Sequence, residues 1–216
     1  MILLTYATTG YSEMVEKHLL PSAANFKVVR IKRPHPVAIW NTEMFVSICV
    51  EKAVCILEMA EQLDDGEVFI YCDGDVKLFG LTPEMVLRDL GDADIAAHAD
   101  RSGPPGDLIC VGFFIIKCSP LIREFLFKWV SLTKERKLND QFVFNSISHE
   151  MATLKILPRE KYWNLGQAGL YYGGDRSELR LISDSAPSGI VMFHANFAIG
   201  PQDKIDLLEA IGNKLK

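Results

Sequence analysis

Two aspartates separated by one glycine follow the most apolar short segment of the chain. Residues 68–72 are rich in β-branched and aromatic side chains, and Asp73 and Asp75 come directly after them. Such a run predicts a buried strand of a parallel sheet. In open α/β sheets ligands bind beyond the carboxyl ends of the strands, and two nearby carboxylates can hold one hard cation there. The pattern therefore predicts a divalent-cation site with a phosphate on the far side of the ion.

The Asp-x-Asp triplet is a weak signal by itself, because the chain contains it twice. The second copy, at Asp92 and Asp94, follows a glycine and precedes an apolar run, which is the composition of a turn that leads into a strand. We therefore predict that Asp92 and Asp94 lie in a solvated turn. Asp73 and Asp75 are favoured as the functional pair by their position after a strand, with a solvated turn as the alternative.

The composition is that of one globular domain. The chain has 216 residues, 49% of them hydrophobic and 24% charged, which is enough for one full core. We expect a single domain over residues 1–216. A formal charge of −5 gives no support to a nucleic-acid partner. The basic cluster Arg30, Lys32 and Arg33 is explained as a solvated loop, with a patch for an anionic ligand or surface as the alternative.

The cysteines indicate a reducing compartment. There are five, most lie inside apolar runs, and none forms a Cys-x-x-Cys motif, so we predict reduced core residues. The apolar first residues lack a preceding basic region and do not predict a signal peptide. No apolar stretch is long enough to span a bilayer. We expect a cytoplasmic protein, in the host cytoplasm if the chain is viral.

Strands and helices are predicted to alternate through the first two thirds of the chain, which indicates an α/β sandwich on a mostly parallel sheet. Apolar runs predict strands at residues 2–7, 26–31, 68–72, 95–98, 108–117, 153–157 and 190–193. Helical spacing predicts helices at about residues 12–20, 42–62, 82–90, 119–130, 139–149 and from 201. Ser12, Thr82 and Ser119 are among the predicted capping residues.

The loop at residues 100–107 is the best candidate for a mobile segment. It combines Gly103 and Gly106 with Pro104 and Pro105, which gives hinges around a stiff tip. We predict that it moves when a ligand binds and helps to cover the site. An ordinary surface loop is the alternative.

The glycine-rich motifs that often hold phosphate do not occur. No Gly-x-Gly-x-x-Gly follows the first strand, and the chain has no Gly-x-x-x-x-Gly-Lys-Ser/Thr. Phosphate must therefore be held in another way. A cation on Asp73 and Asp75 would take the place of a glycine-rich loop in binding phosphate.

Four segments together resemble the GT-A nucleotide-diphospho-sugar glycosyltransferases, most closely the branches called families 8 and 77. They are residues 69–76, 111–117, 139–145 and 193–196, which span nearly the whole chain in the expected order. The chain is also similar in size to small glycosyltransferase domains encoded by large algal viruses. The resemblance implies a GT-A-type, Rossmann-like three-layer sandwich. It also implies transfer of a sugar from a nucleotide-diphospho-sugar, expected to be a UDP-sugar, to a glycan or glycoprotein acceptor.

By this resemblance Asp73 and Asp75 hold Mn²⁺ (or Mg²⁺), with His194 as a third ligand. Carboxylate plus imidazole suits manganese somewhat better than magnesium, and the ion would neutralise the departing diphosphate. A hydrogen-bonded core histidine is the alternative for His194. Gly200 and Lys204 would approach the diphosphate, although they are spaced more widely than in the family.

The resemblance also implies donor contacts elsewhere. Gly74 and Asn196 belong to the matching segments, and the first loop would receive the nucleoside. Lys52 could reach the base or the phosphates. Tyr6 as a simple strand aromatic and Lys52 as a surface lysine are the alternatives. The expected nucleoside contacts are Tyr6, Ala7 and Thr8.

Asp140 and Gln141 resemble the acidic-amide pair near the anomeric carbon of retaining family members. We therefore expect retention of configuration, with both residues near the donor sugar. A helix start capped by Asn139 or Asp140 explains the same residues without excluding that role. If the enzyme inverts instead, a single carboxylate must deprotonate the acceptor, and Asp107 is the candidate.

Two other functions compete with sugar transfer. The string Asp73-Gly74-Asp75-Val76 also fits the first motif of haloacid-dehalogenase-type phosphatases, although that motif normally begins the chain. The second is a non-catalytic module that binds a nucleotide or glycan, because a fold alone does not give a function.

Overall fold

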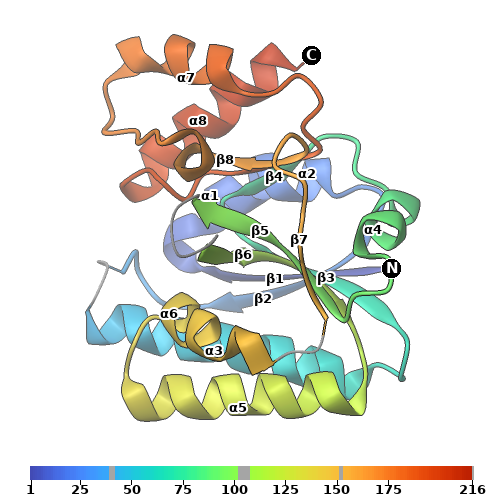
Figure 1. Cartoon of the computed structure of the whole chain (residues 1–216). Coiled ribbons are helices and arrows are strands. Elements are labelled where there is room, and N and C mark those ends of the chain that lie inside the picture. The colour runs from blue at the N-terminus through green and yellow to red at the C-terminus, as the bar shows by residue number, and fades with distance from the viewer. Residues whose placement is uncertain (39–41, 102–107, 151–152, 216) are drawn as a thin grey trace.

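The computed structural model describes residues 1–38, 42–101, 108–150 and 153–215. Its main feature is a six-stranded sheet with the order β2-β1-β3-β6-β5-β7 (Figure 1). Strand β6 runs antiparallel to both of its neighbours, and the other pairs are parallel. The mostly parallel α/β sheet is thus confirmed. The strands are β1 Ile2–Thr8, β2 Lys27–Arg33, β3 Val68–Asp73, β5 Ile95–Arg101, β6 Leu108–Lys117 and β7 Leu154–Ile156.

A second, smaller sheet has the order β4-β9-β8. It was only partly predicted, because β4 and β8 are too short to show a periodic pattern. In this sheet His194 lies opposite Val76 on one side and Asn164 on the other. The small sheet therefore brings the C-terminal histidine beside the end of β3. Its strands are β4 Val76–Leu78, β8 Tyr162–Asn164 and β9 Met192–His194.

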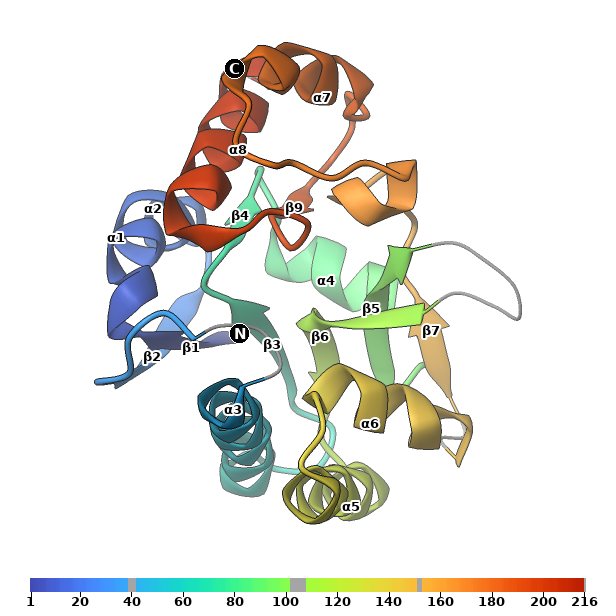
Figure 2. The same ribbon diagram turned by 90° about the vertical axis from the view of Figure 1, so that its left-hand side faces the viewer.

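The helices form the outer layers (Figures 1 and 2). Helices α3, α5 and α6 pack on one face of the central sheet, and α2 and α4 pack on the other with the small sheet. Helices α7 and α8 cover the outer side of the small sheet. The helices are α1 Ser12–Met14, α2 Leu20–Ser22, α3 Glu43–Gln62, α4 Pro83–Leu90, α5 Pro120–Arg136, α6 Asp140–Ile147, α7 Leu179–Ser185 and α8 Gly200–Lys214.

Helix starts follow the predicted capping residues, with one exception. The Thr82 and Ser119 hydroxyls accept hydrogen bonds from the backbone N–H groups of Met85 and Ile122, three residues on. The prediction for Ser12 was wrong, because its buried hydroxyl has no hydrogen-bond partner among the described residues. The segment after Ser12 is a short α-turn, a π-helical stretch at Val15–Leu19 and α2, which contains Pro21.

Aromatic packing fixes α5 and α6 against the sheet. The ring of Phe144 on α6 contacts Trp129, Phe125 and Phe114, with centroid distances of 5.0–5.4 Å. These buried rings stabilise the contact through area and edge-to-face geometry. The Trp129 indole N–H also donates to the Asp140 carbonyl at 2.9 Å. The first turn of α6 is therefore held in one position beside the sheet.

Other sequence predictions have mixed outcomes. Asp92 and Asp94 do lie in the turn before β5. The basic cluster is not a loop, because its residues belong to β2, where Arg30 pairs with Glu16 at 3.0 Å. The five cysteines are buried and free.

Within the described residues, no helix is long and apolar enough to cross a bilayer. Most of the predicted mobile loop, residues 102–107, lies outside the described residues.

Candidate active site

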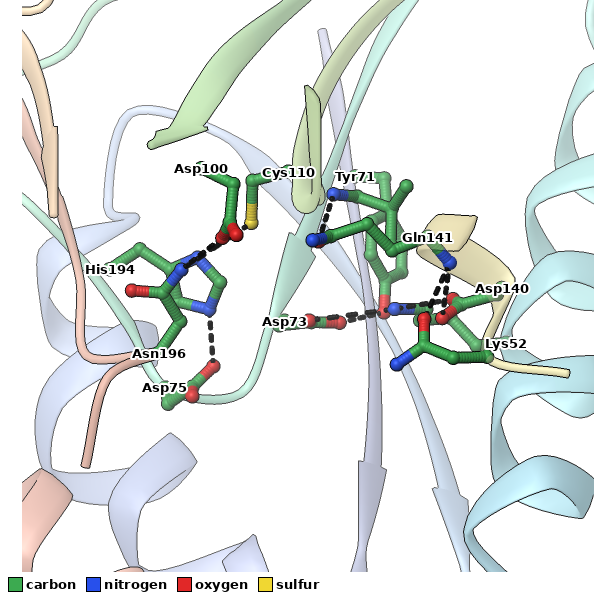
Figure 3. Close-up of polar contacts among 12 residues, drawn as sticks. Lys52, Tyr71, Asp73, Asp75, Asp100, Cys110, Asp140, Gln141, His194 and Asn196 are labelled. Carbon is green, nitrogen blue, oxygen red and sulfur yellow. Dashed lines mark hydrogen bonds and ion pairs between the residues drawn. The ribbon is translucent and has the colours of Figure 1, made fainter. Parts of the chain in front are cut away.

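Asp73, Asp75 and His194 come together at the carboxyl end of β3. Asp73 ends this strand, Asp75 stands two residues on, and the β4–β9 pairing carries His194 to the same place. His194 Nε2 lies 3.1 Å from Asp75 Oδ1. One ligand atom from each of the three side chains lies within 4.8 Å of the others. The predicted cation ligands therefore share one small volume (Figure 3).

Gly112 on β6 leaves room for this group. A Cβ atom at this position would lie 2.2 Å from His194 Cε1 and 2.9 Å from Asp73 Oδ2. Any larger residue would displace these two side chains. The sequence analysis included Gly112 in a matching segment but missed its role, since only the antiparallel approach of β6 to β3 reveals it.

Lys204 on α8 forms an ion pair with Asp75 Oδ2. Its ammonium also lies 6.0 Å from the centre of the Tyr11 ring. Burial opposes ionisation of Asp75, but the Lys204 ammonium and the His194 imidazole hold the pKa of its carboxyl well below its usual range. Gly200 begins α8 with a φ of +81°, a conformation that favours glycine. Its position four residues before Lys204 puts it on the same first turn of the helix.

Lys52 joins Asp73 to Asp140. Its ammonium, on α3, lies 2.7 Å from Asp140 Oδ2 and 3.6 Å from Asp73 Oδ2. Burial alone would lower the pKa of Lys52, but the two carboxylates raise it above its ordinary value. The Tyr71 hydroxyl donates to Asp73 Oδ1 at 2.5 Å. The alternative of Lys52 as a surface lysine is therefore excluded, since the side chain is buried.

Gln141 lies beside β6. Its side-chain oxygen accepts a hydrogen bond from the Val111 N–H at 3.4 Å, and its own backbone N–H is capped by the Asn139 side chain at 2.7 Å. Asn145, one turn later, bonds both the N–H and the carbonyl of Ile109 at 2.9 Å. The start of α6 is therefore fastened along β6, with Asp140 and Gln141 at the end near Asp73.

The predicted nucleoside strip lies next to the aspartates. Tyr6 is opposite Asp73 in the β1–β3 ladder, and Ala7 lies 3.7 Å from the Cβ position of Gly74. Thr8 ends β1, and its buried hydroxyl has no hydrogen-bond partner among the described residues. The Tyr6 hydroxyl instead donates to Glu51 at 3.1 Å. Burial, followed by the nearby Glu51 carboxylate, raises the pKa of Tyr6.

Behind the aspartates lie His98, Asp100 and Cys110, which the sequence analysis did not propose as site residues. His98 and Cys110 contact His194, and Asp100 accepts a hydrogen bond from Asn196 at 2.8 Å. Burial raises the pKa values of the Asp100 carboxyl and the Cys110 thiol. A lone histidine in an apolar strand is a weak signal, so position in the fold was needed to find this group.

The structure thus brings most of the predicted residues into one site. Asp107 is the exception, because it lies outside the described residues. The residues around the site come from β1, α3, the end of β3 and the turn after it, α6, β9 and the segment after it, and α8. They are Tyr6, Ala7, Thr8, Lys52, Asp73, Gly74, Asp75, Asp140, Gln141, His194, Asn196, Gly200 and Lys204.

Residues 17–208 match the nucleotide-diphospho-sugar transferase family. The match covers most of the chain, so the protein belongs to this family and is a glycosyltransferase. The resemblance drawn from the four sequence segments is confirmed, and the family assignment decides against the phosphatase alternative. A search among curated proteins found no match to this chain.

Solved structures show the same fold. A glycosyltransferase involved in glycosylation of the major capsid of PBCV-1 aligns with a TM-score of 0.64 and 13% identity, over 96% of this chain and 98% of that chain. The galactosyltransferase LgtC aligns with a TM-score of 0.55 and 12% identity, over 97% and 96%. The glycosyltransferase GlyE of Streptococcus pneumoniae TIGR4 has a TM-score of 0.57 and 14% identity, over 99% and 62%. At these identities the likeness shows the GT-A fold alone.

Proposed function

We propose that this glycosyltransferase is metal-dependent and uses a UDP-sugar as its donor. The observation that carries the proposal is the convergence of Asp73, Asp75 and His194, whose ligand atoms lie within 4.8 Å of one another. Two carboxylates and an imidazole fit Mn²⁺ well and Mg²⁺ less well. When bound, the ion supplies positive charge that stabilises a departing diphosphate.

The residues around the cation ligands are suited to the rest of the donor. Lys204 and Gly200 are on the first turn of α8, and Gly74 and Asn196 flank the ligands, so we assign these four to the diphosphate and sugar side. Tyr6, Ala7 and Thr8 end β1 on the other side of Asp73, and we assign them to the nucleoside. Lys52 holds Asp73 and Asp140 in place by its two ion pairs. A panel of nucleoside diphosphates tests the base, and we expect UDP to bind best.

Retention of anomeric configuration is the second part of the proposal. We assign Asp140 and Gln141 to the donor sugar, and an active-site mutant of LgtC with glutamate in place of glutamine is among the similar structures. In a retaining transfer the departing diphosphate can itself take the acceptor proton. Asp140 or Gln141 would then stabilise the positive charge that develops at the anomeric carbon.

The donor proposal is tested by thermal unfolding. Manganese with UDP should raise the melting temperature, because a ligand that binds only the folded state stabilises it by mass action. Chelation should abolish the rise, and so should Asp75→Ala, which removes a charge and a ligand. If UDP stabilises Asp75→Ala as much as the wild type, the metal assignment is wrong.

The stereochemical proposal is tested by the product. A proton NMR spectrum of the first-formed glycoside should show the donor's anomer. The opposite anomer would overturn the retaining assignment and make Asp107 the candidate base. Turnover of any nucleotide sugar also separates an enzyme from a module that only binds.

We also propose that residues 1–216 act as one catalytic domain on a glycan or glycoprotein acceptor in the cytoplasm. The three hydrophobic clusters support the first point, because each is built from segments far apart in the chain. The five buried free thiols are consistent with a reducing compartment. Limited proteolysis that yields separately folded fragments would contradict the single domain.

A further inference from the structure

Three side chains with metal-binding atoms meet beside the candidate cation site. They are His98 on β5, Cys110 on β6 and His194 on β9, and we call them the inner cluster. All three are buried, with 0%, 2% and 3% of their surface exposed. His194 Nδ1 lies 3.2 Å from His98 Nε2 and 3.4 Å from Cys110 Sγ. The inner cluster therefore points two imidazole nitrogens and one sulfur at a common space.

These separations match those between the ligands of tetrahedral zinc. Zn–N bonds of about 2.0–2.1 Å and Zn–S bonds of about 2.3 Å place two nitrogens about 3.3 Å apart, and a nitrogen and a sulfur about 3.5 Å apart. Hydrogen bonding alone does not explain the arrangement well. His194 Nδ1 can make one good hydrogen bond, yet it faces both His98 and Cys110. A cation in the shared space would satisfy all three atoms at once.

The surroundings supply what a zinc site usually has. The Asp100 carboxylate is within hydrogen-bond reach of the Cys110 thiol, so it lies beside the inner cluster without belonging to it. Asp75 Oδ1 contacts the other ring nitrogen of His194 at 3.1 Å. A carboxylate on the far nitrogen of a ligating histidine is the common way to fix its tautomer. Asp100 and Asn196 are partly exposed and give the ion a way in.

We propose that the inner cluster binds Zn²⁺ through His98 Nε2, Cys110 Sγ and His194 Nδ1, with water as the fourth ligand. The Cys110 thiol loses its proton to solvent when zinc binds. His194 then carries its remaining proton on Nε2 and donates it to Asp75. Zinc on Nδ1 therefore prevents His194 from ligating a second cation at Asp73 and Asp75. This last step rests on the proposed function, whereas zinc binding itself does not.

Cobalt substitution tests the inner cluster without any activity measurement. Metal-free, reduced protein is titrated with Co²⁺, and a thiolate-to-cobalt charge-transfer band should appear at one equivalent and disappear when Zn²⁺ is added. Cys110→Ser should lose the band. Cys118→Ser, which removes another buried thiol just beyond the same strand, should keep it, and so should Asp73→Asn. Absence of the band in the wild type, or its persistence in Cys110→Ser, would overturn the proposal.

A second measurement covers the case in which Cys110→Ser does not fold. X-ray absorption at the zinc edge of the wild-type protein, loaded with one equivalent of zinc, should show one sulfur and at least two imidazoles. A shell of oxygen and nitrogen without sulfur would place zinc elsewhere and overturn the proposal.

The antagonism is tested separately. One equivalent of Zn²⁺ should reduce the melting-temperature rise given by manganese and UDP at least severalfold in the wild type. In Cys110→Ser, zinc should have little effect on the melting-temperature rise that manganese and UDP give. If the wild type shows the cobalt band but its melting-temperature rise is unchanged by zinc, then His194 does not serve both cation sites. No rise with manganese and UDP even before zinc is added would instead count against the proposed function.

Discussion

Two lysine–carboxylate pairs flank the candidate cation site, and the fold holds them in different ways. Lys52 pairs with Asp140 between α3 and α6, where both side chains are buried, and Lys52 also reaches Asp73. Lys204 pairs with Asp75, and this lysine comes from the first turn of α8. Figure 3 shows the first pair, with Lys52 beside Asp140 and Asp73.

The two lysine–carboxylate pairs differ in the hydrogen bonds that hold their surroundings in place. The Lys52 pair is fixed on every side, since Trp129 bonds the Asp140 carbonyl, Asn139 caps the helix and Tyr71 bonds Asp73. Lys204 pairs with a carboxylate that we assign to the cation. When a cation binds Asp75, the ammonium becomes free for the diphosphate. We therefore expect Lys52 to act in positioning and Lys204 to act on the donor.

Lys52→Met should give the largest effect, on stability. It leaves the buried Asp140 carboxylate without its cation, and breaking a buried ion pair costs about 3–5 kcal/mol. Chemical denaturation measures the change. The double variant Lys52→Met/Asp140→Asn should recover most of the loss, because no unpaired charge remains. Equal losses in the single and double variants would contradict the assigned pairing.

Lys128→Met is the matched control for this experiment. Lys128 on α5 pairs with Glu150 at 2.5 Å, but both side chains are largely solvent-exposed. Exposed pairs contribute little to stability. We expect no measurable change in the free energy of unfolding, and a loss as large as that of Lys52→Met would show that the method does not distinguish buried pairs.

Asp140→Asn should come next, with an effect on turnover. Loss of one group that stabilises charge in the transition state lowers kcat by about 10²–10³-fold. Donor affinity should change far less, because the interaction strengthens only in the transition state. Steady-state kinetics and donor titration separate the two quantities. An equal loss of affinity and turnover would mean that Asp140 only maintains the site.

Lys204→Met should have a smaller effect, on donor binding. A hydrogen bond to a charged group contributes about 1.5–3 kcal/mol, so the donor Kd should rise about 10–100-fold. Stability should fall as well, because Lys204 and Asp75 are both buried and only His194 would remain beside the carboxylate. Calorimetric titration with UDP checks the affinity. An unchanged Kd would leave Lys204 a purely structural partner of Asp75.

Asp89→Asn should have the smallest effect and leaves the site intact. Burial opposes ionisation of Asp89, but Arg88, Tyr162 and Lys161 hold the pKa of its carboxyl below the usual value. A lowered folded-state pKa stabilises the fold above the unfolded value of about 3.9, and this stability is lost as the pH falls. The free energy of unfolding of the wild type should be modestly larger than that of the variant at pH 7, and the two values should converge in acid. Chemical denaturation at several pH values measures both. A difference that grew in acid would contradict the lowered pKa of Asp89.

Much of the fold followed from local signals. Continuous apolar runs identified β1, β3 and β6, and hydroxyl or amide caps identified the starts of α3, α4, α5 and α6. The ends of β3 and β9 also located the three candidate cation ligands. Short strands such as β4 and β8 were not predicted, because three residues are too few to show an alternation of apolar and polar side chains.

The inner cluster could not be predicted, because a register shift creates it. Ala97 pairs with Phe114, but Ala99 pairs with Ile109, so one residue of β5 faces four residues of β6 between those pairs. His98, Cys110 and Gly112 all lie within this irregular stretch. Its geometry depends on tertiary contacts, and no local pattern of residues specifies it.

The central claim is tested most directly by anomalous X-ray diffraction from crystals soaked with manganese and UDP. The account predicts one manganese peak within bonding distance of Asp73, Asp75 and His194, with the diphosphate on its far side near Lys204. The same soak of Asp75→Asn crystals should show neither peak nor diphosphate. Ordered UDP in the wild-type site without a manganese peak at these three side chains would contradict the claim.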